Sequence, residues 1–249
     1  MLTLKYVILG FIQGMTEFLP VSSCAHLVIL QKILSITQNQ ISLSIVLHLG
    51  TVLALVFFFF KQIIKTLKDR ELMLLILLAT LITGIIGILG KDFFTGFFNG
   101  SWWVCIFLLI NGIILIFSKK FLLGKRDILD IKDAVLFGFF QGISIIPGIS
   151  RSGITIFILL LRGVKWQTGF EFSFLSAIPA ILGATFLEAR KISFSLQIES
   201  KNFLLGFLVS FLSGILALWI LKRILQKTKF HYFGYYCIII AIISLLFMR

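Results

Sequence analysis

Charged residues and cysteines are both scarce in this chain of 249 residues. Charged side chains make up 13% of the sequence, and Asp and Glu together number only 10. A soluble domain holds about 25% charged residues, so this composition excludes an ordinary soluble protein. The three cysteines, Cys24, Cys105 and Cys237, are far apart and lack the spacing of a zinc site or a CxxC redox motif. We therefore expect them to be packing residues.

Hydrophobic residues dominate instead, at 59% of the chain with a mean hydropathy of +1.09. A bilayer-crossing helix needs roughly 20 apolar residues, and six stretches are of about that length. Two further apolar stretches, at about 4–36 and 133–163, are each split by a motif of Pro and Ser. Their halves are too short to span, so we interpret each as a re-entrant helix–loop–helix hairpin. The sequence thus predicts an all-α integral membrane protein with transmembrane helices at about 42–60, 72–90, 102–118, 168–188, 203–222 and 233–248.

The chain contains an internal repeat. The pattern Gly-Phe-x-Gln-Gly occurs at 10–14 and again at 138–142, and a Pro followed by Ser comes after each copy. Polar groups and broken helices persist at membrane depth only where they face protein or water. Two copies in corresponding positions indicate a site near the midplane between two halves. Within a single membrane domain, 1–249, we therefore predict repeat halves at 1–118 and 133–249.

The basic residues predict how these halves are oriented. The net charge of +13 is concentrated in short loops between the apolar stretches, at 61–70, 119–132 and 222–229. This pattern argues against a nucleic-acid partner, and the positive-inside rule makes these loops cytoplasmic. The two hairpins then enter from opposite faces, so the halves are inverted. The 188–202 loop would lie outside although it carries the basic residue Arg190, which makes it a minor exception to the rule.

The first hairpin carries an acidic group in apolar surroundings. Gln13 and Glu17 are four residues apart and share one face of a helix. A carboxylate there is costly unless it is paired, protonated or metal-bound. Pro20 should end this helix, because the residue before a proline avoids the α region.

Hydroxyl groups and an imidazole follow this break. Ser22 and Ser23 come first, and His26 lies about one turn further on. We expect Ser23 to cap the next helix, whose free N–H groups would suit an anion. A capped helix start with a core histidine is the structural alternative. The preceding Glu17 favours a functional site.

The second hairpin carries a basic group. Arg151 is the only charged residue between Asp133 and Arg162, and arginine suits bidentate phosphate binding. Pro147 and two glycines permit a tight loop, in which Ser150, Ser152 and Thr155 supply hydroxyl groups. An arginine that reaches the membrane interface is the structural alternative. An anion cradle opposite Glu, His and Ser is typical of phosphoryl transfer.

These motifs resemble a known family. Residues 14–27 resemble the first signature of the undecaprenyl-diphosphate phosphatases, the bacitracin-resistance family, and residues 147–155 and 172–180 are similar to its second and third conserved stretches. The resemblance covers essentially the whole chain. It implies a multi-pass enzyme of the bacterial cytoplasmic membrane, with its site facing the outer side. Its reaction would hydrolyse the polyprenyl diphosphate to the monophosphate, which recycles the carrier for peptidoglycan synthesis and confers bacitracin resistance.

The resemblance also implies roles for individual residues. Glu17 would bind a divalent cation, Mg²⁺ or Ca²⁺, together with Gln13, or would act as acid and base. His26 would be a base or proton shuttle, and Ser23 a candidate nucleophile. The diphosphate would be held by Arg151, Ser150, Ser152, Thr155 and Ser22.

The chain departs from the family pattern at three places, one of which is Ala25, where the family usually has Gly before the histidine. Gln13 stands where the family has Glu or Gln, and one carboxylate fewer weakens the case for a metal. Cys237 stands where the family often has Arg. Two other polar residues lie within spans: His48 is either functional or a packed histidine, and Asn111 is expected to form an interhelical hydrogen bond.

Two alternatives stay open at this point. A polyprenyl-phosphate transporter or flippase could use the same inverted repeat. In the phosphatase, either Ser23 attacks phosphorus, or His26 and Glu17 activate water directly. We expect a polyprenyl diphosphate substrate and contacts with membrane lipids, and homo-oligomerisation is left open.

Overall fold

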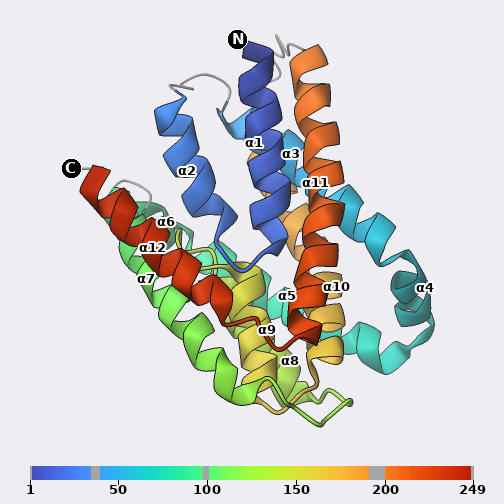
Figure 1. Cartoon of the computed structure of the whole chain (residues 1–249). Coiled ribbons are helices and arrows are strands. Elements are labelled where there is room, and N and C mark those ends of the chain that lie inside the picture. The colour runs from blue at the N-terminus through green and yellow to red at the C-terminus, as the bar shows by residue number, and fades with distance from the viewer. Residues whose placement is uncertain (1, 35–39, 98–100, 191–199, 248–249) are drawn as a thin grey trace.

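The computed structural model describes residues 2–34, 40–97, 101–190 and 200–247, which are almost entirely helical. The last residues of the predicted 4–36 hairpin and the last residue of the predicted 233–248 span therefore lie outside the described residues. So do parts of the loops at 91–101 and 188–202. Figure 1 shows the helices, which in chain order are α1 (Leu2–Phe18), α2 (Ser23–Ile33), α3 (Gln40–Phe58), α4 (Phe60–Lys68), α5 (Arg70–Leu89), α6 (Lys91–Gly96), α7 (Ser101–Phe117), η2 (Ser118–Phe121), α8 (Ile131–Ile143), α9 (Arg151–Leu161), α10 (Trp166–Ala189), α11 (Ser200–Gln226) and α12 (Tyr232–Phe247).

Five of these helices are long and apolar enough to cross a bilayer. They are α3, α5, α7 with its continuation to Phe121, α10 and α11, and they match five of the six predicted spans. The protein is thus a multi-pass membrane protein. The sixth predicted span corresponds to α12, which is apolar but has only 16 residues, shorter than the roughly 20 that a perpendicular span requires.

The two proline motifs each join a pair of short helices. α1 ends at Phe18, just before Pro20, and Ser22 takes a left-handed conformation with φ of 67° before α2 begins. In the second pair, α8 leads to a loop around Pro147, and Ser150 caps α9 by accepting a hydrogen bond from Gly153 N at 3.2 Å. Figure 1 shows α1 and α2 in the upper half of the molecule and α8 and α9 in the lower half.

Close helix contacts at small residues hold each pair against the rest. α1 packs on α11 so tightly that a Cβ on Gly10 would lie 2.5 Å from the Gly206 carbonyl oxygen. α8 packs equally tightly on α5, because a Cβ on Gly138 would lie 2.6 Å from the Ala79 carbonyl oxygen. Such contacts between small residues are a common means of helix association in membranes.

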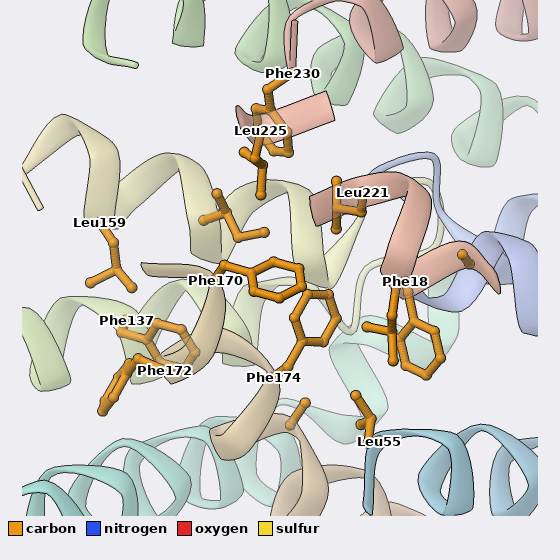
Figure 2. Close-up of a cluster of buried hydrophobic side chains, with 14 of the residues drawn as sticks. Phe18, Leu55, Phe137, Leu159, Phe170, Phe172, Phe174, Leu221, Leu225 and Phe230 are labelled. Atoms are coloured by element: carbon orange, nitrogen blue, oxygen red, sulfur yellow. The ribbon is translucent and has the colours of Figure 1, made fainter. Parts of the chain in front are cut away.

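A phenylalanine-rich core lies beside the first loop. The ring of Phe18, the last residue of α1, meets the edge of Phe174 from α10 at a centroid distance of 5.6 Å. Phe174 also stacks on Phe59 and contacts Phe170, and Figure 2 shows the wider cluster around these rings. Burial of these large rings fixes α10 next to the end of α1.

Candidate active site

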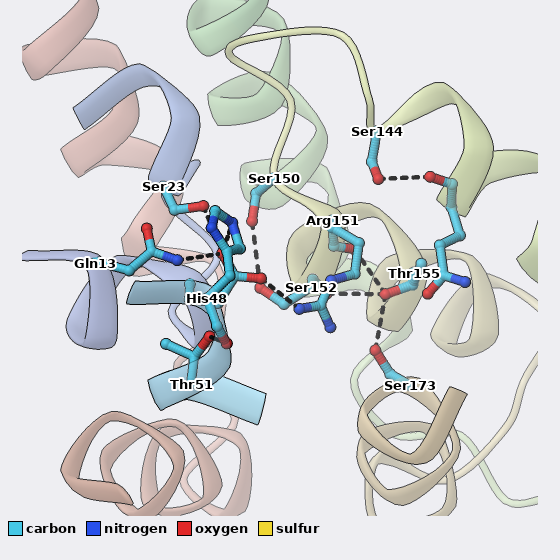
Figure 3. A network of polar contacts seen from close by, with 12 residues as sticks. Gln13, Ser23, His48, Thr51, Ser144, Ser150, Arg151, Ser152, Thr155 and Ser173 are labelled. Carbon is cyan, nitrogen blue, oxygen red and sulfur yellow. Dashed lines mark hydrogen bonds and ion pairs between the residues drawn. The ribbon is translucent and has the colours of Figure 1, made fainter. Parts of the chain in front are cut away.

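The carboxylate of Glu17 is the centre of a buried polar network that joins both motifs. Figure 3 shows its partners Gln13, Ser23 and Arg151. Its Oε1 accepts a hydrogen bond from Arg151 Nη2 at 2.7 Å. Its Oε2 accepts from Ser23 Oγ at 2.7 Å and from Gln13 Nε2 at 3.2 Å. Glu17 is only 9% exposed, so its charge depends on these partners, and removing Arg151 would take away the opposite charge 2.7 Å away.

The local fold explains how the first motif supplies three of these groups. Gln13 and Glu17 lie one turn apart on α1, as predicted. The break at Pro20 then reverses the chain and brings Ser23 back to Glu17. This geometry corrects the predicted cap: Ser22, not Ser23, accepts a hydrogen bond from Ala25 N, at 3.5 Å. The hydroxyl of Ser23 instead donates to the carboxylate.

The hydroxyl groups of the second motif surround the start of α9. Ser150 Oγ lies 3.3 Å from Ser152 Oγ. Thr155 Oγ1 lies 2.8 Å from Ser173 Oγ and donates to the Arg151 carbonyl oxygen at 2.7 Å. All of these side chains are buried. Thr155 thus bonds the backbone of Arg151 directly, and within the described residues of this motif only Arg151 forms a hydrogen bond with Glu17.

Arg151 keeps one hydrogen-bonding group unused. Its Nη1 is buried and has no hydrogen-bond partner among the described residues. Its guanidinium carbon lies 5.8 Å from the centre of the Phe174 ring, a cation–π contact that helps hold the group in place. Arg151 therefore pairs with Glu17 through one nitrogen and offers another to an anion.

Gln13 likewise has an unused atom. Its side chain is fully buried, and its Oε1 has no partner among the described residues. Because a buried amide oxygen without a partner is unfavourable, a water molecule or a ligand is needed to satisfy this atom.

The two histidines near the site have different partners. His48, on α3, places Nε2 at 3.8 Å from Glu17 Oε2, while its Nδ1 lies 2.8 Å from the Ser44 carbonyl oxygen. His48 therefore lies beside the carboxylate at ion-pair distance, too far for a direct hydrogen bond. Its presence as a lone histidine within a span was the only signal in the sequence.

His26 is held away from that carboxylate. Its Nδ1 lies 2.8 Å from the Ser22 carbonyl oxygen, and its Nε2 lies 2.8 Å from the hydroxyl of Tyr236. A carbonyl oxygen can only accept, so Nδ1 carries the proton and Nε2 accepts from Tyr236. The two rings are also stacked, with 5° between their planes. Nothing in the sequence placed Tyr236, 210 residues away, beside His26.

Comparison with known proteins gives full-length matches. The family profile described as Bacitracin resistance protein BacA matches residues 6–243. A protein of Alkaliphilus metalliredigens named undecaprenyl-diphosphatase is 41% identical, over 99% of this chain and 99% of its own length. Proteins of the same name from Thermosipho africanus and Methanococcus vannielii are 40% and 36% identical, over 97% and 98% of this chain and 98% and 100% of their own lengths.

Proposed function

The chain belongs to the BacA family of bacitracin resistance proteins, and from this premise we propose that it is an undecaprenyl-diphosphatase. The enzyme hydrolyses undecaprenyl diphosphate to undecaprenyl phosphate and inorganic phosphate. It thereby recycles the lipid carrier of peptidoglycan synthesis and supports bacitracin resistance. The observation that carries the proposal is the buried contact of Glu17 with both Ser23 and Arg151, at 2.7 Å each.

Arg151 is the proposed anchor for the diphosphate. Its free Nη1 can donate to a phosphate oxygen while Nη2 remains on Glu17. Ser150, Ser152, Thr155 and Ser22 belong to the same proposed binding region, as hydroxyl groups around the two loops. The nearby Phe174 ring excludes water from one side of the guanidinium, which strengthens its attraction for a phosphate.

Ser23 is the proposed nucleophile, with Glu17 as its base. A nucleophile hydrogen-bonded to a base is the arrangement that covalent catalysis requires. Ser23 Oγ forms a bond to the terminal phosphorus, its proton passes to Glu17, and the bond from phosphorus to the bridging oxygen breaks. Undecaprenyl phosphate leaves, and water then hydrolyses the phosphoserine to release inorganic phosphate. A pure carrier has no need for this pair, which favours the phosphatase over a transporter or flippase.

In the proposed mechanism, His26 acts as the base in the second step, in which water hydrolyses the phosphoserine. His26 lies about one turn after Ser23, and its Nε2 could take the proton of the attacking water once that water replaces the hydroxyl of Tyr236. The alternative, in which His26 and Glu17 together activate water for the first attack, is less well supported because Glu17 contacts the Ser23 hydroxyl at 2.7 Å, whereas His26 is bonded to Ser22 and Tyr236 and not to Glu17.

A divalent cation, Mg²⁺ or Ca²⁺, fits this site only if the substrate shares in binding it. The described residues contain no group of three or more His, Cys, Asp or Glu side chains that could hold a metal ion. Glu17 and the unpartnered Oε1 of Gln13 would provide two oxygen ligands. Magnesium sites commonly combine one or two carboxylates with substrate phosphates and water. The cation would neutralise charge that develops on the diphosphate.

We further propose that the halves 1–118 and 133–249 form an inverted repeat with two re-entrant hairpins and a site open to the outer side. The packing supports this arrangement, because α1 contacts α11 through Gly10 and α8 contacts α5 through the corresponding Gly138. Two hydrogen bonds at corresponding positions of the halves also support the repeat. Ser213 Oγ donates to the Gly10 carbonyl at 3.4 Å, and Thr83 Oγ1 donates to the Gly138 carbonyl at 3.0 Å.

The test is phosphate release from a long polyprenyl diphosphate by purified protein in detergent, with and without EDTA. The native protein should release phosphate, EDTA should stop release, and Glu17→Ala should abolish it. Glu188→Ala, which removes an exposed carboxylate at the end of α10, is the matched control and should remain active. No release from folded native protein would refute the proposal.

The nucleophile is tested separately by trapping a phosphorylated enzyme with substrate labelled at the terminal phosphate. Label should remain on the native chain after an acid quench and be absent from Ser23→Ala. An unlabelled native chain that still releases phosphate would instead support direct attack by water.

A further inference from the structure

We propose that Asn111 is a positioning residue of this active site, because its side chain ties the loops of the two motifs to one another. The inference rests on the proposed phosphatase function. Asn111 lies on α7 and is fully buried. Its Nδ2 donates to the Pro20 carbonyl oxygen at 3.2 Å, and its Oδ1 accepts from the Ser150 backbone N–H at 3.0 Å.

The orientation of the Asn111 amide follows from its partners. The Ser150 N–H can only donate, and the Pro20 carbonyl can only accept. The oxygen of the amide must therefore face the second loop, and its nitrogen must face the first. A side chain with one donor end and one acceptor end is what these two backbone groups require.

Both anchored atoms lie next to residues of the site. Ser150 directly precedes Arg151, so the bond from its N–H fixes the backbone from which the guanidinium extends. Pro20 lies between Glu17 and Ser23, at the chain reversal that brings this carboxylate and this hydroxyl together. The hydrogen bonds of Asn111 within the described residues go to Pro20, Ser150 and Cys237 and to none of these three side chains, so its influence passes through the backbone.

Cys237 completes the attachment of the first loop. Asn111 Nδ2 also lies 3.4 Å from Cys237 Sγ, and Cys237 Sγ lies 3.6 Å from the Pro20 carbonyl oxygen. Cys237 is fully buried on α12, next to Tyr236, which holds His26. Close packing of α7 on α12, where a Cβ on Gly112 would lie 2.8 Å from the Gly234 carbonyl oxygen, makes a rigid support behind both loops.

Removal of the amide would release both loops at once. The Pro20 carbonyl would keep only its contact with Cys237, and among the described residues the Ser150 N–H has no hydrogen bond other than that to Asn111. Buried backbone groups without partners are unfavourable, so the loops would move to satisfy them. A displacement of about 1 Å at reacting groups can reduce a rate by roughly a hundredfold.

The experiment compares Asn111→Leu, which has similar size and no polar group, with Asn111→Gln, which keeps the amide. The control is Ser118→Ala, which removes a buried hydrogen bond where η2 continues α7, from Ser118 Oγ to the Leu115 carbonyl at 2.6 Å. Kinetics of phosphate release would be measured in detergent, with thermal unfolding to verify the fold.

We expect Asn111→Leu to lower kcat by about 10- to 100-fold with a much smaller change in KM. Asn111→Gln should recover part of that loss, and Ser118→Ala should stay close to native. A folded Asn111→Leu protein with native kcat would overturn the inference. Failure of both Asn111 variants to fold would also count against it, since Asn111 would then act on stability. Inactive native protein would refute the phosphatase itself, so the two failures are distinguishable.

Discussion

At the scale of single residues, the site depends on which atoms of each polar group already form hydrogen bonds. Glu17 uses both oxygens, whereas Arg151 and Gln13 each keep one buried atom that has no hydrogen-bond partner in the part of the chain that the structure describes. Atoms that already form hydrogen bonds fix the positions of the side chains. Atoms that form none can bind a ligand. The same reasoning separates the two histidines, because His26 is held by Tyr236 while His48 reaches the carboxylate.

The variant Tyr236→Phe tests whether the hydrogen bond from Tyr236 to His26 contributes to catalysis. The change removes the hydroxyl that donates to Nε2 and keeps the stacked ring, so we expect kcat to fall by roughly fivefold, the equivalent of about 1 kcal/mol for one hydrogen bond. The measurement is phosphate release at saturating substrate. Tyr235→Phe removes the hydroxyl of an exposed neighbouring tyrosine and should have no effect. Equal rates for both variants would contradict a role for Tyr236.

The sequence predicted some of these residue contacts and not others. The helical spacing of Gln13 and Glu17 and the break at Pro20 are local properties, and they were predicted correctly. The contacts of His48 with Glu17 and of Tyr236 with His26 depend on how α3 and α12 pack, which no local pattern specifies. The expected cap at Ser23 was wrong because Ser22 already supplies it, which leaves the Ser23 hydroxyl free for the carboxylate.

At the scale of helices, proline and glycine determine the arrangement. Pro20 and Pro147 lie in the loops that join the helices of the two short pairs, and glycines allow α1 and α8 to lie directly against α11 and α5. Apolar length alone predicted five spans correctly. It did not distinguish α12, which has the same composition as the spans but fewer residues.

Gly138→Ala tests the close contact of α8 with α5. The new Cβ would lie 2.6 Å from the Ala79 carbonyl oxygen, so the helices must separate, and we expect a loss of about 1–3 kcal/mol in stability. Thermal unfolding in detergent would measure the loss. Gly84→Ala is the matched control, because its Cβ on α5 would meet no atom within 4 Å, and it should leave the unfolding temperature unchanged or higher. A similar shift for both variants would mean that helix separation is not the cause.

At the scale of the whole molecule, residues 134 positions apart meet in one ion pair between Glu17 and Arg151. Each motif contributes a group that the other lacks: the first has the carboxylate, and the second has the guanidinium. Helices α7 and α12 support both loops from a common side through Asn111 and Cys237. The proposed enzyme is therefore a product of both halves, and neither motif alone contains a complete site.

The most direct test of this joint site is a double-mutant cycle of Glu17→Gln and Arg151→Gln, with kcat/KM for phosphate release as the readout. Each single change should lower kcat/KM by about a hundredfold or more, because each removes one member of a preorganised charged site. If the two residues act as one unit, the double variant should be hardly worse than the poorer single variant. Losses that multiply in the double variant would mean that the two residues act independently, and would contradict a single site built from both halves.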